Sequence, residues 1–288
     1  MRAKAALAGR PDGLLLRSWA ASELGARVVS ALVLAAAALL AAVHGGWPFA
    51  LFWLLAGIAV AAEWTAVTRT EPSGPIRAAT GVGLTALAVA TLLETGAPLG
   101  VLAFLGGGTL VLALGRDPHD RLWALAGFAA AVVIVVVPPW MRNHPELGLA
   151  GLLWMFAVVW TTDIAAYFTG RRLGGPKLWP RVSPKKTWSG FGGGLLAGTL
   201  AGLLTAMLAT RLGWSPVSSP AVVVLISAVA SVVSQLGDLG ESALKRHFDV
   251  KDSGRLIPGH GGAMDRIDGF WSVSLLVGLL LALRSLWS

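Results

Sequence analysis

"LWALAGFAAAVVIVVVPP", residues 122–139, is an apolar run without a single charged side chain. Eight further apolar runs of similar length occupy residues 28–44, 47–64, 78–93, 97–114, 148–169, 190–210, 219–236 and 268–287. Runs of about 17–25 apolar residues are long enough to cross a bilayer as helices. Only helices or closed barrels satisfy the backbone polar groups in lipid. The sequence therefore predicts an all-α integral membrane protein of about nine transmembrane helices, forming one polytopic domain over residues 1–288.

The composition of the chain agrees with a membrane protein. Hydrophobic residues make up 55% of the 288 residues, charged residues 13%, and the mean hydropathy is +0.70. Soluble domains carry about 25% charged residues, so this chain has too few to cover itself in water. Cysteine is absent, which excludes a disulfide framework. The first apolar run lacks a convincing cleavage site, and we expect it to remain as the first helix.

The lysines and arginines favour one orientation of the nine helices. If the N-terminus is cytoplasmic, twenty of the 23 fall in cytoplasmic segments, and only Arg142, Arg211 and Arg284 fall outside. Cytoplasmic loops of membrane proteins are enriched in these residues. The sequence therefore predicts a cytoplasmic N-terminus and an external C-terminus in the cell's inner (plasma) membrane. The same bias explains the net charge of +8, so we expect no nucleic acid partner.

Two long cytoplasmic loops, residues 170–189 and 237–267, hold most of the polar chemistry. Each is longer than a connection between helices needs, and such loops are usually functional or disordered. Trp179 and Trp188 in the first, and Leu256 in the second, argue against a purely solvated segment. Because both loops fall on the same predicted side of the membrane, one site can use residues of both.

The acidic residues are the most selective signal. Asp238 and Glu241 are three residues apart at the end of the eighth run, and Asp265 and Asp268 have the same spacing at the start of the ninth. In a helix, this spacing places both carboxylates of a pair on one face. Asp163 lies within the sixth run, where an ionisable group is costly enough to suggest function. Helix-dipole pairing and a structural ion pair are the alternatives, but converging carboxylates favour a hard cation such as Mg²⁺.

Lysines and glycines complement these acids. "SPKKT" (183–187) offers two lysines and two hydroxyls on a turn that proline stiffens. "PGHGG" (258–262) offers backbone that can approach a ligand closely and donate N–H groups to phosphate oxygens. Each segment alone is commonplace. Together with the carboxylates, they describe a polyphosphate site at a membrane surface.

The segment "SALKRHFDVKDSGRLIPGHGGAMDRID", Ser242 to Asp268, resembles the signature of phosphatidate cytidylyltransferases, or CDP-diacylglycerol synthases. The upstream "DIAAYFTGRRLGGPKLWPRVSPKKTWSG", which begins at Asp163, resembles the second block of the family, except that Ser189 stands where members often carry an acid. The specific resemblance covers about the last 130 residues. We therefore separate an N-terminal helical part, residues 1–147, from a catalytic part, residues 148–288.

The resemblance implies that the chain transfers a cytidylyl group from CTP to phosphatidate for phospholipid biosynthesis. It also implies dependence on Mg²⁺ (with room for a second cation), an active site facing the cytoplasm, and a homodimer in the lipid bilayer. Phosphatidate is a phosphate monoester with a second pKa near 6, so it is largely ionised without a general base. That agrees with the lack of a recognisable Ser–His–Asp or Cys–His set.

The residue types and the resemblance together assign roles within the expected site. Catalysis is expected from Asp238, Lys251, Asp265 and Asp268, of which the three aspartates are the expected metal ligands. Expected substrate contacts are Ser183, Lys185, Lys186, Thr187, Lys245, Arg246, Gly259, His260, Gly261, Gly262 and Arg266. Further candidates are Asp163, Glu241 and Asp252.

Three alternative functions stay open at this point. The chain could act on another lipid phosphate, or it could be a CTP-dependent polyprenol kinase, although the motif favours a nucleotidyltransferase. An ion-coupled transporter would also place acids in a membrane protein. The acids of this chain cluster near one face, however, and the sequence has no repeat of the kind that transporters often show.

Overall fold

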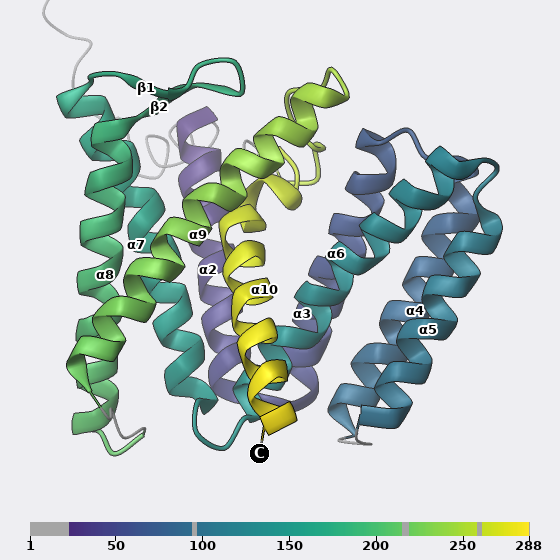
Figure 1. Cartoon of the computed structure of the whole chain (residues 1–288), viewed down its shortest axis with the longest axis horizontal. Coiled ribbons are helices and arrows are strands. Elements are labelled where there is room, and N and C mark those ends of the chain that lie inside the picture. Colours follow the sequence, from purple (N-terminus) through teal and green to yellow (C-terminus); the bar gives the residue numbers. More distant parts are fainter. Residues whose placement is uncertain (1–22, 94–96, 215–218, 258–260, 288) are drawn as a thin grey trace, which may run out of the picture.

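In the computed structural model, which describes residues 23–93, 97–214, 219–257 and 261–287, the chain is a bundle of helices with one small hairpin (Figure 1). The described helices are α2 (Glu23–His44), α3 (Gly46–Val67), α4 (Ser73–Leu92), α5 (Ala97–Leu114), α6 (Pro118–Asn143), α7 (Gly148–Leu173), α8 (Trp188–Arg211), α9 (Pro220–His247) and α10 (Met264–Trp287). Strands β1 (Lys177–Trp179) and β2 (Ser183–Thr187) form an antiparallel pair between α7 and α8. The predicted all-α class is confirmed.

Each predicted apolar run corresponds to a helix in the described part of the chain. Seven of these helices are long and apolar enough to cross a membrane, while α2 and α5 contain the shorter apolar segments Val28–His44 and Pro98–Leu114. The number of nine crossings stays a prediction. Helix α6 continues through Pro138 and Pro139 as far as Asn143. Neighbouring helices can satisfy the backbone groups that a proline leaves unpaired in a membrane.

Helices α7 and α8 pack closely because α8 presents a row of glycines to its neighbour. The buried glycines are Gly190, Gly194, Gly198 and Gly202. A Cβ atom on Gly194 would lie 2.9 Å from the Thr162 carbonyl oxygen, and one on Gly190 would lie 2.8 Å from that of Ala166. Thr162 also donates a hydrogen bond of 2.9 Å to Ser231 on α9. Small residues four apart let membrane helices approach in this way.

An aromatic cluster joins the N-terminal and C-terminal parts of the chain. Trp53 of α3 stacks on Phe270 of α10 with ring centroids 4.7 Å apart. Phe156 of α7 stacks on the same Phe270 ring at 5.3 Å. These residues belong to one buried core together with Ile134 and Met141 of α6. Residues from both sides of position 147 therefore share a core, and the division into two parts stays a prediction.

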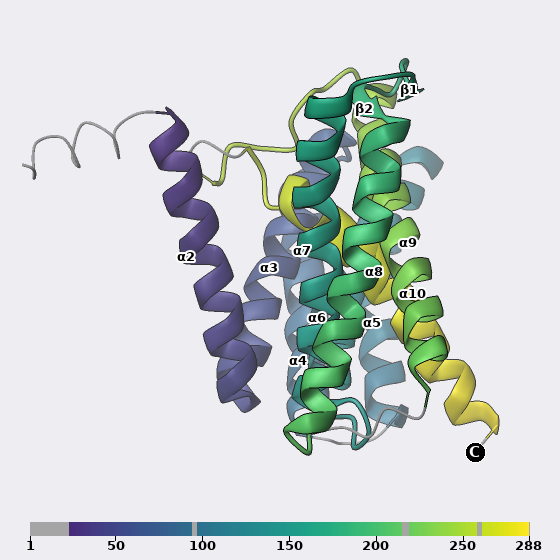
Figure 2. The same cartoon turned by 90° about the vertical axis from the view of Figure 1, so that its left-hand side faces the viewer.

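The hairpin, the C-terminal end of α9 and the segments 248–257 and 261–263 lie at one end of the bundle, and the C-terminal end of α10 lies at the other (Figures 1 and 2). The prediction that both polar segments lie at the same end of the helices is therefore confirmed, and the side of the membrane on which that end lies stays a prediction. The predicted extent of the loops is wrong. Residues 237–247 continue helix α9, and 183–187 form a strand rather than a turn. Polar side chains on α9 interrupt the apolar pattern because they face a polar cavity rather than lipid.

Candidate active site

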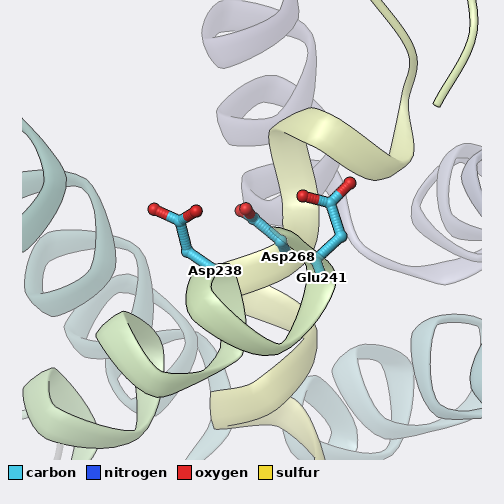
Figure 3. A group of neighbouring side chains, drawn as sticks. All are labelled: Asp238, Glu241 and Asp268. Atoms are coloured by element: carbon cyan, nitrogen blue, oxygen red, sulfur yellow. The ribbon is translucent and has the colours of Figure 1, made fainter. Parts of the chain in front are cut away.

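Three carboxylates meet where α9 crosses α10 (Figure 3). Asp238 and Glu241 come from α9 and Asp268 from α10, and each offers an oxygen atom within 4.8 Å of the other two. We call these three residues the acid cluster. The close crossing depends on Gly237, since a Cβ atom there would overlap Ser272 and lie 3.0 Å from the Asp268 carbonyl oxygen. The crossing thereby brings acids together that are far apart in the sequence.

Two lysines reach the acid cluster from different elements. Lys186 of strand β2 forms an ion pair of 2.5 Å with Asp238. Lys245, one turn beyond Glu241 on α9, pairs with that residue at 2.9 Å and with Asp265 at 2.5 Å. The hairpin and α9 therefore place positive charge on both sides of the carboxylates. Such a mixed arrangement suits phosphate groups and a cation in one site.

Asp265 lies beside the acid cluster, shares Lys245 with Glu241, and is also held by the chain around it. Its Oδ2 atom accepts hydrogen bonds from the Ser253 N–H at 3.1 Å and the Gly262 N–H at 2.9 Å, and the Ser253 hydroxyl oxygen lies 3.0 Å away. Its Oδ1 atom faces Lys245. The structure thus places Glu241 in the cluster and gives Asp265 a role in joining Ser253 to Gly262 ahead of α10. Metal binding by Asp265 stays a prediction.

Two cavities border the acid cluster. A polar cavity of about 880 Å³ lies among α7, the hairpin, α9 and the start of α10, and its lining includes Lys177 and Arg171. An apolar cavity of about 500 Å³ lies among α3, α6, α9 and α10, and its lining includes Trp64 and Trp271. Glu241 and Asp268 line both cavities. The acid cluster therefore stands at the boundary between a polar and an apolar space.

The polar cavity brings together most of the predicted site residues. Its lining contains Asp163, Lys185, Lys186, Thr187, Asp238, Glu241, Lys245, Asp252, Asp265, Arg266 and Asp268. Other predicted residues that the structure describes lie outside this lining: Ser183, Arg246, Lys251, Gly261 and Gly262. Gly259 and His260 lie outside the described residues, so their predicted roles stay predictions.

Some predicted residues have a structural partner of their own. The Thr187 hydroxyl accepts a hydrogen bond of 3.1 Å from the Gly190 N–H and so caps the start of α8. The Arg246 guanidinium donates to the Val250 carbonyl oxygen at 3.2 Å. Ser189, the position that departs from the family pattern, donates to the Gly174 carbonyl oxygen. Each of these polar side chains therefore has a hydrogen-bond partner within the protein, even without a ligand.

Three charged residues that the structure describes near the site were not among the predicted site residues. Lys177 and Arg171 line the polar cavity, and their place in the basic segment 170–189 could have indicated them. Glu63 of α3 is buried and accepts hydrogen bonds from Ser253, Ala263 and Met264. In the sequence, Glu63 stands out only as an acidic residue near the end of the apolar run 47–64. Only its contacts show what that carboxylate does.

Comparison with known proteins gives one consistent result. A family model described as "Cytidylyltransferase family" matches residues 25–284. Proteins named phosphatidate cytidylyltransferase from Brucella suis and Brucella melitensis are each 40% identical over 259 residues, which is 90% of this chain and 93% of each relative. The one from Bacillus subtilis is 45% identical over 146 residues, or 50% of this chain and 52% of that protein. The similarity thus extends well beyond the last 130 residues, into the helices that the sequence motifs left unassigned.

Proposed function

The chain belongs to the cytidylyltransferase family, and we propose from this premise that it transfers the cytidylyl group of CTP to phosphatidate. The products are CDP-diacylglycerol and pyrophosphate. The observation that carries the proposal is the position of Glu241 and Asp268 on the wall of both cavities. A lipid phosphate needs an apolar space for its acyl chains beside a polar space for its headgroup and for the nucleotide. The acid cluster stands where those two parts of the substrate meet.

The reaction is mainly an electrostatic problem. A phosphate oxygen of phosphatidate attacks the α-phosphorus of CTP, the bond from that phosphorus to the bridging oxygen breaks, and pyrophosphate leaves with the electron pair. Both substrates are anions, so cations must reduce their repulsion and stabilise the charge on the leaving group. Lys177, Lys185, Lys186, Lys245 and Arg266 line the polar cavity and supply that charge. A general base is not required, since the lipid phosphate is already ionised.

The acid cluster fits a hard cation such as Mg²⁺. Its donors are all carboxylate oxygens, which Mg²⁺ prefers. The Oε1 atom of Glu241 is buried without a hydrogen-bond partner among the described residues, which is costly unless something else satisfies it. Asp238, Glu241 and Asp268 would hold the ion, and a second cation in the same site stays a prediction. When bound, Mg²⁺ offsets phosphate charge in the transition state.

The basic residues that lie outside the polar cavity keep their proposed roles as phosphate contacts. Arg246 follows Lys245 directly, and Lys251 precedes Asp252, and both of those neighbours line the cavity. Both side chains are exposed, and Arg246 would exchange its hydrogen bond to the Val250 carbonyl oxygen for one to a phosphate of the bound nucleotide. The site would then gather further positive charge when CTP binds.

The chain is a multi-pass membrane protein, and we propose that it lies in the inner membrane with its active site facing the cytoplasm. The division of lysines and arginines supports that orientation, with a cytoplasmic N-terminus and an external C-terminus. CTP is a cytoplasmic substrate, so the polar cavity has to open to that side. The family resemblance supports a homodimer, which cross-linking in native membranes would test.

The experiment that tests the proposed reaction uses CTP labelled with ³²P at either of two phosphates. Purified protein in mixed micelles of detergent and phosphatidate should convert α-labelled CTP into a labelled lipid in the presence of Mg²⁺. The γ label should appear in pyrophosphate alone. Transfer of the γ label to the lipid would identify a kinase, and a lipid that stays unlabelled in both reactions would exclude the proposed function. Glu241→Gln serves as the inactive control.

A further inference from the structure

Glu63 is a buried acid that connects the N-terminal helices to the signature segment. Its side chain lies on α3, one turn before the helix ends at Val67, and the residue is only 7% exposed. Oε1 accepts a hydrogen bond of 2.8 Å from the Ala263 N–H. Oε2 accepts one of 2.8 Å from the Met264 N–H and one of 2.9 Å from the Ser253 hydroxyl. Three donors from the signature segment therefore converge on one carboxylate that lies about 200 residues earlier in the chain.

The contacts of Glu63 cap the N-terminus of α10. That helix begins at Met264, and the first N–H groups of a helix have no partner within it. A residue beside the first turn usually supplies the acceptor, but Ala263 has no side-chain oxygen to do so. Glu63 supplies it from another helix, and its negative charge also suits the positive end of the α10 dipole. Asp265 accepts the preceding N–H, that of Gly262, so two carboxylates hold this end of the helix.

Two glycines of the signature segment make room for the Glu63 side chain. A Cβ atom on Gly254 would lie 2.9 Å from Glu63 Oε1. One on Gly262 would overlap both the Ser253 hydroxyl and the Glu63 carboxylate. Any larger residue at either position would push the segment off the carboxylate. Because they have no side chain, the two glycines let the backbone approach the Glu63 carboxylate closely.

We propose that Glu63 is a positioning residue for cytidylyl transfer. It holds the first turn of α10, and so sets where Asp268 stands in the acid cluster. The Ser253 hydroxyl lies between the Glu63 and Asp265 carboxylates, which extends the connection to the Asp265–Lys245 ion pair. Glu63 itself is not among the described residues that line the two cavities, so it acts through these neighbours. This inference rests on the proposed function.

The variant Glu63→Gln tests the inference because it keeps the shape of the side chain. A glutamine has one acceptor oxygen, and its NH₂ group would face a backbone N–H of Ala263 or Met264. Asp120→Asn is the matched control. Asp120 is also 7% exposed and also accepts a backbone hydrogen bond, 2.9 Å from the Glu71 N–H, but it is remote in sequence from the signature segment. Both variants remove one buried negative charge and keep the side-chain volume.

The measurements are kcat per folded enzyme, KM for CTP and hydrogen–deuterium exchange of the peptide 253–264. Loss of a residue that orients metal-site groups typically costs about 10- to 100-fold in activity. Glu63→Gln should lower kcat in that range and leave KM for CTP within about threefold. It should also speed exchange of the Ala263 and Met264 amides, whose acceptor has changed. Asp120→Asn should change neither kcat nor this exchange.

Each other outcome overturns the inference. A normal kcat in Glu63→Gln with faster exchange would make Glu63 a structural cap only, and unchanged exchange would show that the contacts do not hold the segment. If Glu63→Gln does not fold, Gly254→Ala takes its place, since its methyl group presses on the intact carboxylate and should lower kcat while the protein still purifies. Normal kcat in that variant would equally refute the inference. A failure of the proposed function is distinct, because the wild-type enzyme would then form no α-labelled lipid.

Discussion

Replacing Lys245 with methionine would show how strongly one lysine balances the carboxylates beside the acid cluster. Its Nζ lies 2.9 Å from Glu241 and 2.5 Å from Asp265, and all three side chains are at most 12% exposed. At an effective dielectric constant of about 20, each contact represents roughly 6 kcal/mol of Coulomb energy before desolvation is subtracted. Removing one member of a buried ion pair costs about 3–5 kcal/mol, because its partner stays buried and unpaired. We expect Lys245→Met to lower the free energy of unfolding by that amount.

The assay is the temperature at which detergent-solubilised protein loses its monodisperse peak on gel filtration. A loss of about 3–5 kcal/mol should lower this midpoint by about 5–15 °C. Adding Glu241→Gln to Lys245→Met removes one of the two unpaired charges and should recover about half of the loss, without restoring activity. Lys185→Met is the control, since Lys185 lines the same cavity but is exposed. Equal shifts for the two lysine variants, or no recovery in the double variant, would refute this account of the charge balance.

The site and the fold support four further predictions. Asp268→Asn should raise the Mg²⁺ concentration for half-maximal activity more than tenfold with little change in the thermal midpoint, because its carboxylate belongs to the acid cluster. Asp265→Asn, in contrast, should lower the thermal midpoint, since it loses the charge that its hydrogen-bond donors and Lys245 surround. Equal thermal midpoints for Asp265→Asn and Asp268→Asn would contradict this division of roles. Gly194→Leu should separate α7 from α8 and reduce the yield of folded protein, which gel filtration after expression would reveal. Cysteines introduced at Ser183 and Asn143 should differ in intact cells, with only the one at Asn143 labelled by an impermeant thiol reagent, and labelling at Ser183 would reverse the proposed orientation.

The sequence by itself predicted the helical membrane class because a bilayer leaves an apolar chain few choices. A run such as residues 122–139 must form its own backbone hydrogen bonds in lipid, so its length and polarity determine its structure. The signature between Ser242 and Asp268 likewise pointed to the family, which the comparisons confirm. Helix ends were less predictable, since α9 continues to His247 through residues whose polarity suggested a loop.

The tertiary structure decided which carboxylates share a site. Spacing at i and i+3 puts Asp265 and Asp268 near one face of α10, but it does not say which neighbours each one meets. The crossing of α9 over α10 brings Glu241 to Asp268, while Lys245 and the backbone around Ser253 engage Asp265.

Glu63 shows the same limit more sharply. In the sequence it is a single acid at the end of an apolar run, and no local pattern links it to a helix that begins about 200 residues later. Hydrogen bonds between distant segments depend on how helices pack, and packing depends on side-chain shapes across the whole bundle rather than on spacing along one helix. The chemistry of each residue could therefore be predicted from the sequence, whereas its partners could be known only from the folded chain.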